Sequence, residues 1–380
     1  MVMRIALVEA AYPTLGADYV VHKQLVDSAV ERNDIEVLSI SNPGLRDDDS
    51  KGIQRRFVAL SAPGANRIER QLKLGRLLPG AVREASKIIE DFQPDVIYSS
   101  QQRRDNLLAT ILAQRAGTPR IVHLHYPYGP WIGRLAAATV KRADHVIAVS
   151  EFIRESTLLR GLKDEQVSTV HFPATPMEDF SDRAETRERL GLAPDTRVVL
   201  TVGRLDPNKG VQWVLRVLPK IIPDVPDLRV LICGNSVHFP GFEDELRALC
   251  TSLDLDDHVS FLGHRGDVPA IMRASDVFCL PTEMDAYPLV FPEAMRAGLP
   301  IVAARSGGVP EAVADGVNGL LSLPRDLDAL EANLRRVLLD RELAEAMGKA
   351  SHARLRENFD PATTSDRWCS IIEGVVSQRA

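Results

Sequence analysis

Residues 280–321 read LPTEMDAYPLVFPEAMRAGLPIVAARSGGVPEAVADGVNGLL, and the order of segments in this stretch indicates the fold class. The helical segment EAMRA stops at Gly298, and Leu299-Pro300 leads directly into the apolar run IVAA. Glycine commonly ends a helix, and proline prevents its continuation. A helix that passes at once into a short apolar strand is typical of a parallel α/β sheet.

The same alternation of apolar runs and helix-length amphipathic stretches continues along the chain. A first series of predicted strands lies at 4–8, 35–40, 96–98, 121–125 and 145–149, and a second at 198–202, 229–233, 259–262, 277–280 and 301–303. Between the two series the chain is rich in proline and charge. Two doubly wound α/β domains in tandem are therefore predicted.

The length of 380 residues suits two domains of ordinary size. We place the first domain at 1–175, a linker at 176–194 and the second domain at 195–357, while the amphipathic stretch 364–376 can pack on either domain. Ligands of open α/β sheets bind outside the carboxyl ends of the strands. A site in a cleft between two facing domains is therefore expected.

The composition, with 45% hydrophobic and 26% charged residues, is that of a globular cytosolic protein. The apolar run at 5–8 is broken by Glu9, which fits neither a signal peptide nor a spanning helix. The four cysteines are far apart and have no metal-type spacing, so we expect free thiols. These features predict a cytoplasmic enzyme.

The sequence TVGRLDPNKG, residues 201–210, places Arg204 and Lys209 in the loop after the first strand of the second domain. Two cations around a proline-containing turn can converge on a diphosphate that gains negative charge as its bond to a sugar breaks. No Asp-any-Asp metal motif stands out in a helix-breaking context. We expect a reaction without a metal ion and without a cofactor; the alternative is that both cations are ordinary surface charges.

Two carboxylates follow the predicted strand at 277–280. Asp285 lies in the loop, and Glu293 lies near the start of the next helix, where it can accept two hydrogen bonds from a vicinal diol such as ribose. The backbone N–H groups of Leu289 and Val290 enter that helix and suit a phosphate. The alternatives are that Asp285 only forms a turn and that Glu293 is a common first-turn acid.

These motifs together resemble the retaining glycosyltransferases of family 4, which have the GT-B fold. The resemblance rests on GRL and NKG at 203–210, a carboxylate seven residues before EAM.AG.P.VA, GGVPE at 307–311 and DG.NG.L at 315–320. It extends over most of the chain through ADHVIAVSEFIRE at 143–155 and VSFLGHRGDVPAIMRASDVFCLPT at 259–282. It implies an N-terminal acceptor domain and a C-terminal donor domain, both Rossmann-like, with a helix at about 358–380 that crosses back.

The resemblance also implies a reaction: transfer of a sugar from a UDP- or GDP-sugar to a hydroxyl acceptor, with retention at the anomeric carbon and without metal. The implied catalytic residues are Arg204, Lys209, Asp285 and His125. The implied donor-binding residues are Gly16, Glu293, Leu289, Val290 and Arg265. Arg204 and Lys209 would hold the diphosphate, Asp285 the donor sugar and Glu293 the ribose, while His125 would line the acceptor side.

Three positions depart from the family pattern. Asp285 stands where glutamate is usual, so its carboxylate reaches one methylene less far; Gly16-Ala17 replaces paired glycines, and Ala174-Thr175 replaces Asn-Gly. His123 lies two positions before His125 and on the same strand face, so one of the two can be a hydrogen-bonded core histidine.

A basic stretch at 66–87 bears on the nature of the acceptor, and it carries Arg67, Arg70, Lys73 and Arg76. This stretch is either a solvated helix or a surface for an anionic or lipid-linked acceptor, with peripheral contact at the inner membrane face. It contains no aromatic residue, so no nucleic-acid partner is expected.

Doubly wound α/β domains also perform other functions. The sequence EAAYPTLGADY after the first strand lacks Gly-any-Gly-any-any-Gly, which argues against a dinucleotide oxidoreductase. A nucleotide-sugar epimerase of the same fold and a catalytically silent nucleotide-sugar-binding protein remain open alternatives. A small-molecule acceptor is as compatible with the sequence as a lipid-linked one.

Overall fold

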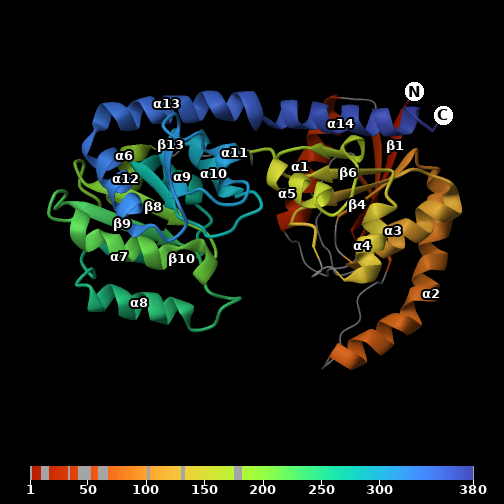
Figure 1. Cartoon of the computed structure of the whole chain (residues 1–380), viewed down its shortest axis with the longest axis horizontal. Coiled ribbons are helices and arrows are strands. Elements are labelled where there is room, and N and C mark those ends of the chain that lie inside the picture. The colour runs from red at the N-terminus through yellow and green to blue at the C-terminus, as the bar shows by residue number, and fades with distance from the viewer. Residues whose placement is uncertain are drawn as a thin grey trace. The chain divides into compact units, whose positions relative to one another are not determined.

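The computed structural model describes residues 2–9, 17–32, 35–41, 53–58, 67–100, 103–129, 133–174 and 182–379; at 17–21, 23, 32, 67–77, 103 and 135 it describes the backbone alone. The chain forms two units (Figure 1). Unit 1 combines Met1–Pro173 with Pro361–Ala380, and unit 2 is Ala174–Asp360.

Unit 1 contains a parallel sheet of seven strands in the order β3-β2-β1-β4-β5-β6-β7. Its strands are β1 (Met3–Glu9), β2 (Ile35–Ser41), β3 (Ile53–Phe57), β4 (Val96–Ser100), β5 (Arg120–Leu124), β6 (His145–Ala148) and β7 (Val167–Thr169). Its helices are α1 (Ala17–Arg32), α2 (Arg67–Phe92), α3 (Arg103–Ala116), α4 (Arg134–Lys141), α5 (Glu151–Leu158) and α14 (Pro361–Ser377). The strand order reverses between β1 and β4, which is where ligands bind in such sheets.

Unit 2 contains a second parallel sheet, of six strands in the order β10-β9-β8-β11-β12-β13. Its strands are β8 (Arg197–Val202), β9 (Leu228–Cys233), β10 (Val259–Gly263), β11 (Val277–Leu280), β12 (Ile301–Ala304) and β13 (Gly319–Ser322). Its helices are α6 (Arg183–Arg189), α7 (Val211–Ile221), α8 (Phe242–Ser252), α9 (Val268–Ala274), α10 (Val290–Arg296), α11 (Val309–Ala312), α12 (Leu327–Leu339) and α13 (Arg341–Asn358). The order reverses between β8 and β11, the strands that precede the predicted donor loops.

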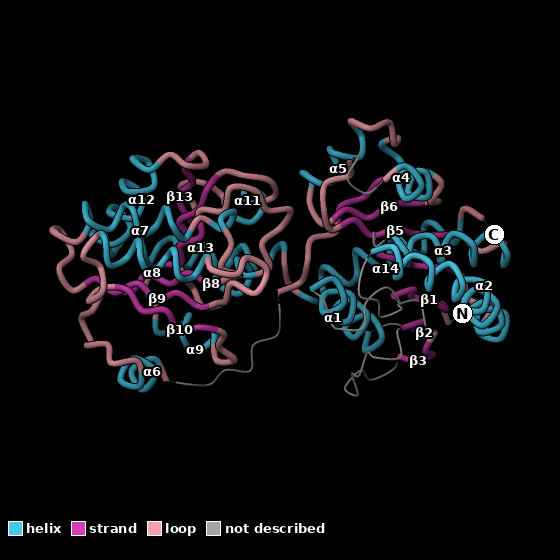
Figure 2. Tube along the Cα trace, turned by 90° about the horizontal axis from the view of Figure 1, so that it is seen from below, coloured by secondary structure: helices cyan, strands magenta, loops and turns pink. Residues whose placement is uncertain are grey.

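Helices lie on both faces of each sheet (Figure 2), so the central strands are buried on both sides. The prediction of two doubly wound α/β domains is confirmed. The helix-to-strand junction is also as predicted: α10 ends at Arg296, Gly298 has a φ of +71°, and β12 begins at Ile301. A Cβ on Gly298 would lie 2.7 Å from His352 Nε2, so packing as well as conformation favours glycine here.

The C-terminal helix α14 packs within unit 1. Ser365 Oγ donates to the carbonyl of Leu25 (3.2 Å), and Ser28 Oγ donates to the carbonyl of Pro361 (3.3 Å), which joins α14 to α1. Trp368 is 1% exposed, and its ring meets Tyr98 edge to face at a centroid distance of 5.5 Å. The apolar stripe of 364–376 therefore completes the core of the unit that contains the N-terminus.

The stretch 176–194, expected as a linker, contains helix α6 of unit 2. Arg187 is 5% exposed and donates to the carbonyl of Ala274 (2.8 Å), while Arg183 donates to Asp276 Oδ1 (2.7 Å). The arginines of this helix bind carbonyl and carboxylate oxygens at the end of α9, which attaches α6 to unit 2. None of the described helices is both long and apolar enough to cross a membrane.

Candidate active site

The predicted cation and acid of the donor loops meet at the carboxyl edge of the unit 2 sheet. Lys209 ends the short 3₁₀ turn Pro207–Lys209 after β8, and Asp285 lies in the loop between β11 and α10. Lys209 Nζ lies 2.5 Å from Asp285 Oδ2, and the two side chains are 16% and 14% exposed. The lysine that the resemblance assigns to the diphosphate and the aspartate that it assigns to the donor sugar therefore form one ion pair.

Backbone geometry explains why Lys209 reaches this position. The next residue, Gly210, has a φ of +78°, and a Cβ there would lie 2.3 Å from the carbonyl oxygen of Pro281. The turn is also capped, because the side chain of Asp206 accepts a hydrogen bond from the backbone N–H of Asn208 (3.0 Å). Only glycine permits the loop after β8 to lie against the end of β11 in this way.

Arg204 lies in the same loop as Lys209 but forms an ion pair with Asp206 and not with Asp285. Its guanidinium is 57% exposed and lies 3.4 Å from Asp206 Oδ2. Asp206 is only 4% exposed, so this ion pair joins a buried carboxylate to a guanidinium that faces solvent. The structure thus brings Lys209 and Asp285 together and leaves Arg204 paired with Asp206.

The remaining predicted residues of unit 2 lie at the start of α10 and in the loop after β10. Leu289 is the N-cap of α10, Val290 is its first residue, and Glu293 lies in its first turn. Arg265 follows β10 and donates two hydrogen bonds of 2.7 Å to Asp267, and these bonds hold the pKa of the Asp267 carboxyl below its ordinary value. Arg265 is therefore already engaged within its own loop.

The loop that carries Asp285 is held by residues that sequence reasoning missed. The side-chain amide of Asn208 donates to the backbone carbonyl of Met284 (2.6 Å). The backbone carbonyl of Asn208 accepts from the backbone N–H of Glu283 (2.8 Å). The N–H of Gly308 donates to the carbonyl of Asp285 (2.9 Å). The loop thus has fixed contacts with the turn after β8 and with the turn after β12.

Glu283 adds a third contact to this loop. Arg325 donates to both of its carboxylate oxygens (2.8 and 2.7 Å), and Trp213 Nε1 donates to one of them (3.1 Å). These hydrogen bonds, first those from Arg325, lower the pKa of the Glu283 carboxyl. Arg325 has a φ of +66°, an uncommon conformation for a non-glycine residue, so the backbone of its turn is strained. No local pattern signalled this contact, because the partners are 42 residues apart.

Two predicted residues belong to unit 1. His125 follows β5, is 4% exposed, and packs against the rings of His123, His22 and Phe172. Gly16 lies outside the described residues, as does Thr175 of the Ala174-Thr175 pair. The side chains of Arg67, Arg70, Lys73 and Arg76 are likewise outside the description, although the backbone there belongs to α2.

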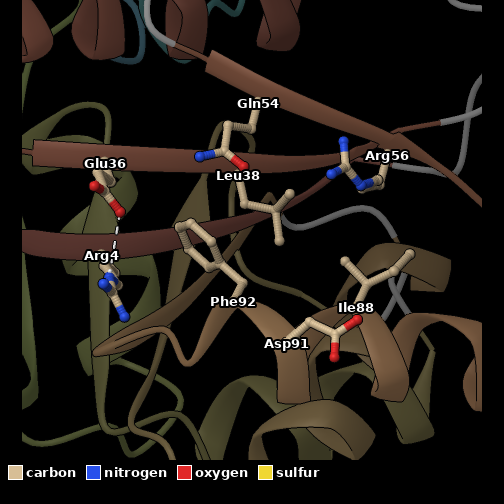
Figure 3. Close-up of a pocket in the computed structure, with 8 residues that line it drawn as sticks. All are labelled: Arg4, Glu36, Leu38, Gln54, Arg56, Ile88, Asp91 and Phe92. Carbon is tan, nitrogen blue, oxygen red and sulfur yellow. Dashed lines mark ion pairs between the residues drawn. The ribbon is translucent and has the colours of Figure 1, made fainter.

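A hollow of about 300 Å³ lies elsewhere, between the sheet of unit 1 and the last turns of α2 (Figure 3). It is lined by opposite charges, including Arg4, Glu36, Arg56 and Asp91, and Arg4 Nε is 3.2 Å from Glu36 Oε2. Arg4 and Glu36 are near the amino ends of their strands, opposite to the edge where ligands of such sheets bind. None of the predicted site residues lines it.

Two family profiles match the chain: "Glycosyltransferase Family 4" over residues 24–173 and "Glycosyl transferases group 1" over residues 182–354. A GDP-mannose-dependent alpha-(1-6)-phosphatidylinositol monomannoside mannosyltransferase of Mycolicibacterium smegmatis is 32% identical over 288 residues, which cover 69% of this chain and 72% of that protein. A D-inositol 3-phosphate glycosyltransferase of Corynebacterium efficiens is 36% identical over 199 residues, which cover 50% of this chain and 46% of that protein. The chain thus spans about half the length of the second relative.

Solved structures share the fold over nearly the whole chain. HepE of Anabaena, crystallised with UDP, superimposes with a TM-score of 0.80 at 23% identity, covering 98% of this chain and all of that one. The sucrose-phosphate synthase of Thermosynechococcus elongatus gives a TM-score of 0.80 at 22% identity, covering 99% of this chain and 100% of that one. At these identities the likeness concerns the fold.

Proposed function

The chain belongs to glycosyltransferase family 4, and on that premise we propose that it transfers a mannosyl group from GDP-mannose to a hydroxyl of an inositol phosphate acceptor, with retention and without a metal ion. As a member of the family it is a glycosyltransferase that uses nucleotide sugars. GDP-mannose is proposed because the Mycolicibacterium relative is named for it. The acceptor is proposed because both relatives have an inositol phosphate group in their names.

The observation that carries the proposal is the ion pair between Lys209 and Asp285. A donor diphosphate in this loop offers Lys209 a stronger anionic partner than one carboxylate. Asp285 is then released and can accept hydrogen bonds from hydroxyls of the donor sugar. The ion pair thus places both groups side by side in the loops that are proposed to bind the donor.

The same loops suit the proposed leaving group. The bond from the sugar to the diphosphate breaks, and negative charge grows on the diphosphate, where Lys209 and Arg204 would stabilise it. These two cations supply the charge that a metal ion provides in other enzymes. In this proposal Glu293 binds the ribose, the N–H groups of Leu289 and Val290 bind phosphate oxygens, and the loop of Arg265 borders the base.

Unit 1 is proposed to bind the acceptor. His125 would lie beside the donor sugar on the acceptor side, and the loop of Gly16 would approach the diphosphate. The basic stretch 66–87 supports an acceptor that carries phosphate, either free or in a lipid headgroup at a membrane surface. Charge reversal at Arg70, Lys73 and Arg76 should weaken acceptor binding or vesicle binding. If both are unchanged, the stretch is only a solvated helix.

The test is a transfer assay in EDTA with GDP-mannose or UDP-glucose and with two acceptors, inositol phosphate and phosphatidylinositol in vesicles. The proposal expects a mannosylated product from one acceptor and an α linkage by NMR. A β-linked product would contradict retention, and a requirement for Mg²⁺ would contradict metal independence. An isomer of the donor formed without acceptor would identify an epimerase, and donor binding without any product would identify a silent binding protein.

A further inference from the structure

Three buried histidines meet at the carboxyl edge of the unit 1 sheet. His22 comes from α1, while His123 and His125 come from β5 and the position after it, and they are 2%, 0% and 4% exposed. One ring nitrogen from each histidine lies within 4.8 Å of the other two. Among the described residues, this is the one group of three or more potential metal ligands in which the ligand atoms are so close.

The distances approach those of a metal site. His22 Nε2 is 3.1 Å from His123 Nδ1. Tetrahedral zinc, with Zn–N bonds of 2.0–2.1 Å, separates its ligand nitrogens by about 3.3 Å. This contact is a hydrogen bond between the two rings, at nearly the spacing of two zinc-bound nitrogens. The ligand atoms of all three residues lie within 4.8 Å of one another, so a ring movement of about 1.5 Å would close the set.

Glu9 orients the first of these ligands. The carboxylate of Glu9, the last residue of β1, lies 2.5 Å from His22 Nδ1. A carboxylate on one ring nitrogen directs the other nitrogen to the metal and raises its basicity, which is the usual outer contact of metal-binding histidines. Here it leaves Nε2 of His22 directed at His123.

The two ring nitrogens of His123 have different surroundings. Nε2 of His123 has no hydrogen-bond partner among the described residues, although it is fully buried. The Tyr98 hydroxyl is 2.6 Å from Nδ1, the nitrogen that also faces His22, so a metal bound to Nδ1 would replace this hydrogen bond.

We propose that His22, His123 and His125 form a binding site for one first-row divalent metal ion, with Zn²⁺ as the ligand tested. Three neutral imidazoles suit zinc, copper and nickel better than magnesium or calcium. Three protein ligands also leave a fourth position for water. This site lies in the acceptor unit and plays no part in binding the donor diphosphate.

The proposal has a functional consequence that rests on the proposed role of His125 in transfer. A metal bound to His125 holds its ring among the other two histidines and removes it from the acceptor side. Zn²⁺ should therefore inhibit transfer, and EDTA should restore it. A transferase that needs no metal ion for its reaction would then be inhibited by a bound metal ion.

Metal binding is measured without donor or acceptor, so its outcome is independent of the proposed function. The untagged full chain is dialysed against Zn²⁺ and then against metal-free buffer, and its metal content is determined by mass spectrometry. The proposal expects one Zn²⁺ per chain, and with Co²⁺ the visible absorption of a four-coordinate ion. A content near zero, or six-coordinate Co²⁺ absorption, would overturn it.

Variants locate the site. His22→Gln removes a ligand but can still donate to Glu9, and it should abolish stoichiometric binding. Glu9→Gln retains all three ligands and should weaken Zn²⁺ binding about 10- to 100-fold. His238→Gln, at an exposed histidine of unit 2, is the matched control and should bind one Zn²⁺. Circular dichroism identifies any variant that fails to fold. Folded His22→Gln and Glu9→Gln that both bind Zn²⁺ as the wild type does would refute the site.

Discussion

Arg325 donates two hydrogen bonds to Glu283, and Glu283 lies two residues before Asp285 in the loop between β11 and α10. The position of the proposed donor-sugar residue therefore depends on a side chain that comes from the turn after β13. Trp213 contributes a third hydrogen bond from α7. The loop is thus held by parts of unit 2 that are far from one another in the sequence.

Arg325→Ala should lower kcat/KM for the donor, because the loop that carries Asp285 loses its two hydrogen bonds. A misplacement near 1 Å can lower the rate by up to about 100-fold. Thermal stability should change little, because Arg325 is 67% exposed. The matched control is Arg247→Ala, at an exposed arginine paired with Glu243 on α8, which should leave donor kinetics unchanged. Equal donor kinetics in Arg325→Ala and the wild type would mean that the hydrogen bonds from Arg325 to Glu283 do not position the loop.

Gly307→Ala should weaken donor binding through direct contact with the Asp285 loop. A Cβ on Gly307 would lie 1.9 Å from the carbonyl oxygen of Asp285, and its φ is +50°. Gly316→Ala is the control, because Gly316 also has a positive φ (+76°) but no atom within 4 Å of the added Cβ. The control should lose about 1–2 kcal/mol of stability from conformation alone. Calorimetric titration with GDP would show the difference, and equal affinities would contradict the contact.

Lys209→Ala and Arg204→Ala should each reduce turnover by loss of leaving-group stabilisation. Removal of one such donor costs about 2.7–4 kcal/mol, a loss of roughly 100- to 1000-fold. Steady-state kinetics at saturating donor measure this loss. Lys220→Ala, at a 61% exposed lysine on α7, serves as the control of equal charge. Near-normal turnover in both single variants would remove the proposed role of these cations.

Glu293→Gln should weaken donor binding while the fold is retained, because an uncharged amide accepts weaker hydrogen bonds from ribose. The loss of hydrogen bonds to a charged group is about 1.5–3 kcal/mol, or roughly 10- to 150-fold in Kd. The affinity for GDP, compared with that of the wild type, measures it. An unchanged Kd would exclude Glu293 from the ribose.

Local sequence was sufficient to predict most of the fold. Gly298 with Leu299-Pro300 marked the change from α10 to β12, and the apolar runs marked the central strands. The prediction missed the strands β3, β7 and β13. Two of these are only three and four residues long, and β3 (IQRRF) is largely polar, so none has the long apolar run of a buried central strand.

The site was predictable only in part, for a different physical reason. Arg204, Lys209, Asp285 and Glu293 could be singled out because each lies in a recognisable turn or helix start. The pairing of Lys209 with Asp285 spans 76 residues and follows from the adjacency of β8 and β11, which a reading of single segments does not provide. His22 was missed likewise, because α1 brings it to His123 from 101 residues away.

We propose that unit 2 binds a nucleoside diphosphate sugar without a metal ion. The most direct test is a thermal-shift measurement in EDTA with GDP, UDP, ADP, TDP and CDP and their sugar conjugates, since a ligand of the folded state raises its apparent stability. GDP and GDP-mannose should raise the Tm in EDTA, and Lys209→Ala should reduce this rise. A rise that appears only with added Mg²⁺, or no rise with any of these nucleotides, would contradict the proposal.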